Sequence, residues 1–256
     1  MSRRLLRCAG LAALMTVGMA PRAWCDPDTL RVDLTAQGAP TTAFVVTPPG
    51  KDPIPAIVVI HEWWGLNGQI RGMARRFADL GYVTIVPDLY RGKVAFDPET
   101  AHELMRGLPE ERALSDIEAA IAWLRTQPRV ARSKIGIVGF CMGGRLSQLT
   151  ALESKDIAAC VMFYGQPETH PDKLAALSAP LLAHFGAEDQ GIGQDQVDAL
   201  KAGLQKAGKT RFEIYVYPGA GHAFMNETGR GYHADAARLG WARTTDFFRR
   251  ELKAKK

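Results

Sequence analysis

Cysteine is scarce in this sequence, and several motifs that indicate metal or cofactor binding are absent. The 256 residues include only four cysteines, too few for the disulfide framework on which small exported domains depend. There is no HExxH, no CxxC and no glycine-rich phosphate loop, so neither a metal nor an organic cofactor is expected. Hydrophobic residues make up 46% and charged residues 23% of the chain. This composition is typical of a globular protein and excludes a disordered, collagen-like or coiled-coil chain.

The basic excess is confined to the first 25 residues. The formal net charge is +5, but four of the 32 basic residues lie in residues 1–25, which contain no acidic residue. The other 28 basic residues are nearly balanced by 27 acidic ones. Nucleic-acid binding therefore loses its main compositional support, and no nucleic-acid partner is expected.

Residues 1–25 have the pattern of an export signal. Arginines near the start precede an apolar run from Cys8 to Ala20, which is too short to cross a bilayer as a helix. We expect cleavage between about Ala20 and Cys25, a periplasmic or secreted mature protein, and no membrane anchor in it. The Arg3-Arg4 pair leaves two routes open, the Sec pathway and the twin-arginine pathway.

The remaining residues, 26–256, predict a single α/β domain, which we expect to be a monomer. After a predicted hairpin the chain alternates apolar runs of strand length with amphipathic stretches, a pattern typical of a mainly parallel sheet with helices on both faces. The predicted hairpin strands are Leu30–Leu34 and Ala43–Thr47. The later predicted strands are Ala56–Ile60, Tyr82–Val86, Ile135–Val138, Ile157–Phe163, Pro180–Phe185 and Phe212–Tyr217. The predicted helices are Gln69–Leu80, Glu110–Arg125, Gly144–Leu152, Gln194–Ala207 and His233–Lys253.

The most informative segment is Gly139-Phe140-Cys141-Met142-Gly143-Gly144, which lies between a predicted strand and a predicted helix. It is the thiol version of the Gly-x-Ser-x-Gly nucleophile elbow, in which small neighbours allow a sharp turn beneath an exposed nucleophile. The amino end of the following helix favours a thiolate and offers N–H groups to an oxyanion. Cys141 is therefore the candidate nucleophile; the alternative is a buried cysteine in a glycine-rich turn.

A base and an orienting acid follow in the expected chain order. Asp189 comes just after the predicted strand Pro180–Phe185, and His222 follows the strand Phe212–Tyr217. The carboxyl ends of parallel strands are where open α/β sheets build their sites. We therefore expect His222 as the base and Asp189 as its partner, with Glu188 as the alternative acid. The other histidines are expected to be structural.

With these residues in place, the chain resembles the dienelactone hydrolase family of α/β-hydrolases. The family's Cys, Asp and His match Cys141, Asp189 and His222, and its Glu-x-x-Gly segment matches Glu62-Trp63-Trp64-Gly65. A further family segment matches Pro87-Asp88-Leu89-Tyr90. The resemblance implies that Glu62 holds the resting thiol protonated and takes its proton when substrate binds. It also implies that the backbone N–H groups of Trp63 and Met142 form an oxyanion hole.

Residues expected to bind substrate depart in part from the family pattern. Trp63, Trp64, Tyr90 and Phe224 are expected to line the pocket. The family places one arginine two residues after the Tyr and another four residues after the His, where this chain has Gly92 and Asn226. Arg91 and Arg145 are the remaining candidates for gripping a substrate carboxylate, a task that suits the guanidinium fork.

The sequence thus predicts a hydrolase that cleaves carboxylic esters or lactones of small-molecule substrates through a cysteine acyl-enzyme. One alternative is a non-catalytic ligand-binding or sensor protein on the same fold. A second is a thiol-redox protein, against which the absence of a resolving cysteine near Cys141 counts. Cys160 lies inside an apolar strand, where a free cysteine behaves as a small hydrophobic residue.

Overall fold

The computed structural model describes residues 28–36 and 39–253. The predicted export signal, residues 1–25, lies outside the described residues. Within the described ranges, eight strands form one sheet in the order β1-β2-β4-β3-β5-β6-β7-β8. The strands are β1 (Asp28–Ala36), β2 (Ala39–Thr47), β3 (Ile54–Ile60), β4 (Val83–Pro87), β5 (Val130–Phe140), β6 (Ile157–Phe163), β7 (Leu181–Gly186) and β8 (Phe212–Tyr217).

The sheet is mainly parallel, as the apolar runs predict. The pairs from β4 through β3, β5, β6 and β7 to β8 are all parallel. The β1–β2 hairpin and the β2–β4 pair are antiparallel. Parallel strands need covered crossovers, and the helices supply them on both faces. The helices are α1 (Gly68–Asp79), α2 (Pro98–Arg106), α3 (Glu110–Thr126), α4 (Met142–Glu153), α5 (Pro171–Leu174), α6 (Gln194–Lys206) and α7 (Ala234–Phe248), which continues into a π-helical turn (Arg249–Lys253).

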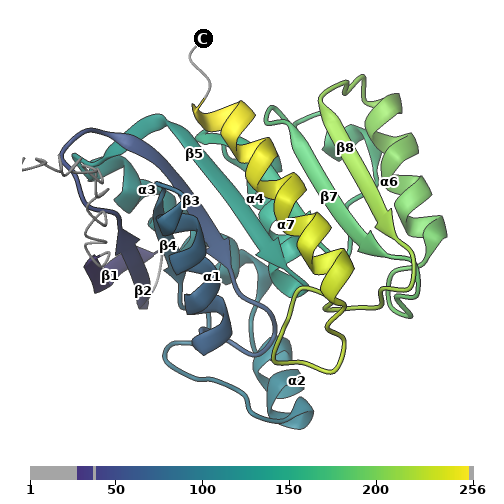
Figure 1. Ribbon diagram of the computed structural model, residues 1–256, viewed down its shortest axis with the longest axis horizontal. Helices are drawn as coiled ribbons and strands as arrows, with labels where there is room; N and C mark the ends of the chain where they lie inside the picture. Colours follow the sequence, from purple (N-terminus) through teal and green to yellow (C-terminus); the bar gives the residue numbers. More distant parts are fainter. Residues whose placement is uncertain (1–27, 37–38, 254–256) are drawn as a thin grey trace, which may run out of the picture.

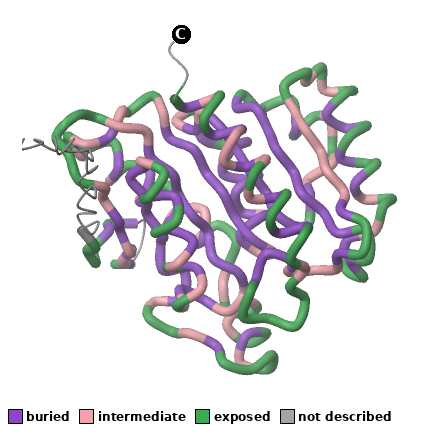
Figure 2. Tube along the Cα trace, viewed as in Figure 1, coloured by how far each residue is buried: buried purple, intermediate pink, exposed green. Residues whose placement is uncertain are grey.

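Two hydrophobic cores result, one on each face of the sheet. Helices α1 and α7 lie across one face in Figure 1, with α3 and α4 behind the sheet. Alternate residues of β3 supply the two cores, because successive side chains of a strand point to opposite faces. Val58 and Ile60 belong to the core with α3, α4 and α6, and Ile57 and Val59 to the core with α1 and α7. The central strands are accordingly buried along most of their length (Figure 2).

These features define an α/β-hydrolase fold, with the carboxyl ends of the parallel strands gathered at one edge of the sheet. Two short helices that the periodicity did not predict, α2 and α5, follow β4 and β6. Helix α2 begins with an Asp97 cap that accepts a hydrogen bond from Thr100 N at 2.9 Å. It lies beyond the carboxyl ends of the strands (Figure 1). No helix among the described residues combines the length and apolar character needed to cross a membrane.

Candidate active site

Cys141 occupies a sharp turn between β5 and α4. Its φ of 54° lies in the left-handed region, which a residue other than glycine adopts at a cost in strain. The flanking glycines make the turn possible, because there is no room for a side chain beside it. A β-carbon at Gly139 would lie 1.8 Å from the carbonyl oxygen of Gly143, and one at Gly143 would lie 2.5 Å from that of Ile60. The segment Gly139–Gly144 therefore forms a tight, strained turn between a strand and a helix.

Asp189 and His222 meet beside this turn. His222 Nδ1 donates a hydrogen bond to Asp189 Oδ2 at 2.7 Å. The other oxygen of Asp189 accepts hydrogen bonds from the backbone N–H groups of Gly191 (2.9 Å) and Ile192 (3.2 Å). Burial raises the pKa of Asp189, but these hydrogen bonds outweigh burial and lower the pKa below its ordinary value. Glu188, the alternative acid, is exposed to solvent.

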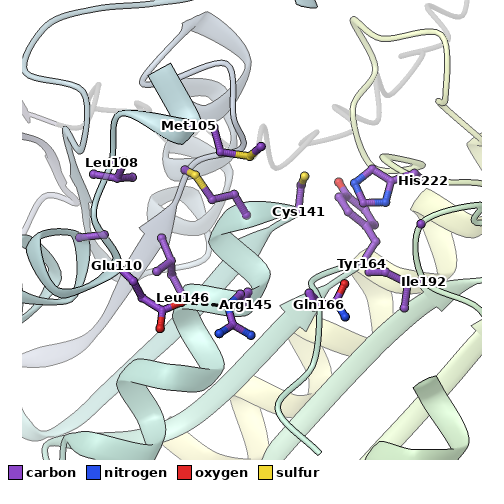
Figure 3. Close-up of a pocket in the computed structure, with 13 residues that line it drawn as sticks. Met105, Leu108, Glu110, Cys141, Arg145, Leu146, Tyr164, Gln166, Ile192 and His222 are labelled. Atoms are coloured by element: carbon purple, nitrogen blue, oxygen red, sulfur yellow. Dashed lines mark hydrogen bonds and ion pairs between the residues drawn. The ribbon is translucent and has the colours of Figure 1, made fainter. Parts of the chain in front are cut away.

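His222 also interacts with Cys141, so the residues predicted to be nucleophile, base and acid lie next to one another. Burial lowers the pKa of His222, but hydrogen bonds with the side chains of Asp189 and Cys141 outweigh burial and raise the pKa to about 10. The arrangement thus stabilises an imidazolium next to the sulfur. In Figure 3 the side chains of Cys141, His222 and Tyr164 converge on one cavity.

Glu62 follows β3 and is buried, and its carboxyl group accepts hydrogen bonds from two side chains elsewhere in the chain. Tyr164 Oη donates to Glu62 Oε1 at 3.1 Å, and Asn226 Nδ2 donates to Oε2 at 2.6 Å. Burial raises the pKa of Glu62, against the smaller lowering effect of these two hydrogen bonds. The carboxyl group is therefore anchored on Tyr164 and Asn226 in this structure, and its oxygens form no hydrogen bond to Cys141.

Cys141 opens into a cavity of about 440 Å³. Most of the wall is apolar, and its polar groups are few. The lining residues are Met105, Leu108, Glu110, Ala113, Cys141, Met142, Arg145, Leu146, Tyr164, Gln166, Gly191, Ile192 and His222. Arg145 donates from Nε to Glu110 Oε2 at 2.9 Å, so the one guanidinium in this lining is neutralised by a carboxylate on α3.

The other residues predicted to bind substrate do not line this cavity. Arg91 forms a two-pronged ion pair with the buried Asp116, at 2.6 and 2.9 Å. Tyr90 is buried, with its ring centroid 5.0 Å from that of His61 and its hydroxyl 3.5 Å from Met142 Sδ. Phe224 is fully buried and packs edge-to-face on Tyr164, at 5.1 Å between ring centroids.

The two tryptophans form an aromatic cluster with α2. Trp63 and Trp64 pack edge-to-face at 5.0 Å between ring centroids, and Trp63 packs on His102 of α2 at 4.8 Å. Both are half-buried, and neither is among the residues that line the cavity. Their contacts tie α2 to the loop that carries Glu62. The backbone N–H groups predicted to form an oxyanion hole belong to this loop (Trp63) and to the first residue of α4 (Met142).

Sequence reasoning missed Tyr164, which touches Glu62 and His222 and lines the cavity. Its ring centroid lies 5.1 Å from that of His222, and its φ of 38° is in the left-handed region. In the sequence it extends the apolar run of β6. The signal was its position just beyond a parallel strand and before Gly165, where a side chain leaves the sheet edge. No group of three or more His, Cys, Asp or Glu side chains in residues 28–36 and 39–253 is arranged to hold a metal ion.

The fold and this constellation define the class of protein: an α/β-hydrolase with a Cys–His–Asp arrangement at the sheet's carboxyl edge. Residues 41–252 match the model of the dienelactone hydrolase family. The chain belongs to the dienelactone hydrolase family, and it is a hydrolase of that type.

Similar proteins agree with this assignment. A protein of Methylorubrum extorquens, provisionally named a carboxymethylenebutenolidase, is 34% identical over 232 residues, covering 85% of this chain and 79% of that protein. A crystal structure from Klebsiella pneumoniae, provisionally named a dienelactone hydrolase, is 30% identical with a TM-score of 0.79, covering 88% of this chain and 99% of that one. A metagenomic dienelactone hydrolase-like phosphotriesterase is 23% identical with a TM-score of 0.81 (89% and 100% covered), a likeness that concerns the fold alone.

Proposed function

We propose that this protein hydrolyses carboxylic esters or lactones through a covalent acyl-enzyme on Cys141. The observation that carries the proposal is the strained elbow at Cys141 with His222 beside the sulfur and Asp189 bonded to His222 at 2.7 Å. A nucleophile, a base and an orienting acid in this order are the elements of acyl transfer.

In the first half of the reaction the Cys141 sulfur attacks the substrate carbonyl carbon and a C–S bond forms. The negative charge moves to the carbonyl oxygen, where the backbone N–H groups of Trp63 and Met142 hold it. When the tetrahedral intermediate collapses, the C–O bond breaks and the leaving alkoxide takes a proton from the His222 imidazolium. The product is a thioester on Cys141 and a free alcohol, or, from a lactone, one ring-opened chain.

Acylation prepares His222 for the second half. The hydrogen bond and the charge of the Cys141 side chain contribute to the raised pKa of His222. Once the sulfur is acylated its negative charge is gone, so the pKa of His222 falls and the neutral imidazole can take a proton from water. The hydroxide attacks the thioester, the C–S bond breaks, and the carboxylic acid leaves.

Glu62 is proposed to regulate the resting thiol. Burial raises its pKa, which suits a carboxyl group that must accept a proton near neutral pH. A thiolate left unprotected in an oxidising compartment would be oxidised or capped. A resting state in which Glu62 receives the thiol proton only when substrate enters would limit this damage.

The cavity favours neutral, apolar substrates. Its wall is mostly apolar, Arg145 is paired with Glu110, and Arg91 is paired with Asp116 outside the cavity. Glu62 accepts a hydrogen bond from the neutral amide of Asn226, which stands at the position where the family pattern described above has an arginine. A substrate carboxylate would be desolvated here without a free guanidinium to meet it, and such a charge is costly to bury.

The test compares kcat/KM for a neutral aryl ester and its carboxylate-bearing analogue, together with intact-mass detection of the acylated Cys141. We expect the neutral ester to be cleaved at least as efficiently. A strong preference for the acidic analogue that disappears in Arg145→Ala or Arg91→Ala would overturn the substrate assignment. Ligand binding without turnover or acylation would instead favour the sensor alternative.

We also propose that the protein is exported. The charge and apolar pattern of residues 1–25 supports this proposal. Fusing these residues to a reporter that is active only outside the cytoplasm, with Arg3 and Arg4 both changed to Lys in a second fusion, tests export and its route. Loss of export in the Lys variant would indicate the twin-arginine pathway, and an inactive parent fusion would contradict export.

A further inference from the structure

His61 lies at the end of β3, next to Glu62, and the mechanism above gives it no role. Its side chain is fully buried, yet only one of its two ring nitrogens has a partner. Nδ1 lies 2.6 Å from the backbone carbonyl oxygen of Glu62, whereas the buried Nε2 has no hydrogen-bond partner among the described residues. A buried polar side chain with this single contact calls for an explanation.

The contact fixes the tautomer of His61. A carbonyl oxygen only accepts hydrogen bonds, so Nδ1 carries the proton and donates it to Glu62 O. Burial lowers the pKa of His61, so the ring is neutral and Nε2 is the unprotonated nitrogen. The same carbonyl oxygen accepts a second hydrogen bond from the backbone N–H of Gly65 at 3.1 Å.

Two donors on one carbonyl oxygen set the orientation of the whole peptide unit. The Glu62 carbonyl and the Trp63 N–H belong to the same planar trans peptide and point in opposite directions. Holding the oxygen on His61 and Gly65 therefore aims the Trp63 N–H the other way. That N–H has no partner within residues 28–36 and 39–253, so it is free to receive an oxyanion.

The preceding peptide unit, His61–Glu62, is packed against the turn that carries Cys141. A β-carbon at Gly143, in the first turn of α4, would lie 2.6 Å from the carbonyl oxygen of His61. The segment that follows β3 and the first turn of α4 are thus in direct backbone contact. A small rotation of the Glu62–Trp63 peptide would change the direction of one N–H relative to the other donor, Met142.

We propose that His61 is a positioning residue for the oxyanion hole: its Nδ1–H, together with the Gly65 N–H, holds the Glu62–Trp63 peptide so that the Trp63 N–H points at the oxygen that becomes negative during attack. This inference rests on the proposed function. It assigns His61 a role through the backbone and no contact with substrate.

The test separates reactions that need an oxyanion hole from one that does not. His61→Leu removes the donor at similar bulk, and His61→Asn keeps an N–H at the place of Nδ1. We expect His61→Leu to lower kcat for ester hydrolysis by about 100-fold with little change in KM, since loss of one oxyanion-hole donor has effects of roughly this size. Alkylation of Cys141 by iodoacetamide creates no oxyanion, so its rate should stay within about twofold.

A second readout does not depend on turnover. An aldehyde adds to Cys141 to give a hemithioacetal: a C–S bond forms and the thiol proton passes to the former carbonyl oxygen, which occupies the oxyanion position. We expect His61→Leu to weaken aldehyde binding by about the same factor as kcat and His61→Asn to recover most of both losses. If the wild type hydrolyses no ester, the proposed function fails, and aldehyde affinity still tests His61.

Three outcomes would overturn the role of His61. Equal loss in His61→Leu and His61→Asn would show that packing, and not the donor, matters. A parallel fall in the alkylation rate would show that His61 acts on the thiol. Unchanged kcat and unchanged aldehyde affinity would show that the peptide keeps its orientation without His61. Thermal unfolding of each variant verifies that a folded protein is being compared.

Discussion

Two histidines with opposite electrostatic surroundings come from adjacent strands of the sheet. His184 lies within β7, and its ring nitrogens contact two hydroxyl groups, Tyr217 Oη at 2.8 Å and Thr244 Oγ1 at 3.1 Å. Burial, with a smaller contribution from Arg243, lowers its pKa to about 3. His222 lies beyond the end of β8, and its bonds to Asp189 and Cys141 raise its pKa to about 10. Burial keeps the first imidazole uncharged, whereas the Asp189 carboxylate favours the imidazolium of the second.

The two cysteines of the described residues divide in the same way. Cys160 is buried in β6, and burial raises its pKa to about 12, against a smaller lowering effect of the Ser147 side chain. Cys141 is half-buried, lies in the left-handed region, and opens into the cavity beside His222. The same residue types are inert inside the sheet and available for chemistry at its carboxyl edge. Position in the sheet therefore separates structural from candidate functional residues better than residue type does.

The sharpest test of this contrast substitutes the two cysteines separately. We expect Cys141→Ala to lower kcat/KM for ester hydrolysis on the order of 10⁴-fold or more, because it removes the proposed nucleophile. The control, Cys160→Ala, should stay within about threefold, since it removes only one buried sulfur. Activity within about tenfold of wild type in Cys141→Ala would contradict the mechanism.

The rates at which an alkylating reagent labels the two cysteines measure the same difference without substrate. We expect iodoacetamide to modify Cys141 on the order of 10³-fold faster than Cys160 in the folded protein, because Cys160 is buried and burial raises the pKa of its thiol, whereas Cys141 opens into the cavity. Peptide mass spectrometry at increasing times gives both rates. The two rates should converge in denaturant, and comparable rates in the folded state would show that Cys160 is not protected by the sheet.

Glu62→Gln changes the group proposed to accept the thiol proton. We expect kcat to fall by about 10²-fold, within the range that proton transfer contributes, and the rate of Cys141 alkylation without substrate to change. Glu188→Gln, an exposed carboxylate on the loop next to Asp189, is the matched control and should leave both quantities unaltered. Normal kinetics together with normal alkylation in Glu62→Gln would leave Glu62 as a buried structural carboxyl group only.

The smallest expected effect is on stability at low pH. An unfolded chain binds a proton at His184 below about pH 6.5, whereas the folded protein does so only near pH 3. The unfolded state therefore holds more protons between these values, and stability falls as the pH is lowered through them. Between pH 7 and pH 5 this one residue should reduce the free energy of unfolding by about 2 kcal/mol.

The measurement compares denaturant unfolding of wild type and His184→Gln across this pH range. The wild type should lose more stability than the variant on acidification, and the difference isolates His184 from the carboxylates that titrate in the same range. Identical pH dependence of the two proteins would mean that His184 carries a proton in the folded state as readily as in the unfolded one.

Much of the fold follows from local patterns, and the remainder depends on tertiary contacts. Alternation predicted the two hairpin strands and apolar runs predicted the other six. Strand β5 begins at Val130, before the predicted Ile135, because Val130 pairs with Ile54 across a register shift. Helices α2 and α5, of nine and four residues, are too short for a clear periodicity. Cys141, Asp189 and His222 could be chosen as candidate site residues because each follows a predicted strand.

Side-chain partners across long chain separations could not be read from the sequence. In the sequence, Asn226 stands where the family pattern has an arginine. In the structure it donates a hydrogen bond to Glu62, which is 164 positions away in the chain. Arg91 reads as a candidate for binding an anion, but Asp116 on α3 takes both of its amino groups. Each pairing depends on how a loop packs against another element, and one sequence contains no direct record of that packing.

The glycines around Cys141 determine which changes the elbow can tolerate during evolution. The side chain at position 141 points into a cavity, whereas Gly139, Gly143 and Gly144 have other backbone atoms within 1.8 to 2.6 Å of where a β-carbon would lie. In a library of random variants, we expect serine at position 141 to be accepted by the fold and any side chain at the three glycines to be rejected. A lineage of such proteins could therefore exchange its nucleophile in one step while the surrounding turn stayed unchanged for as long as the fold existed.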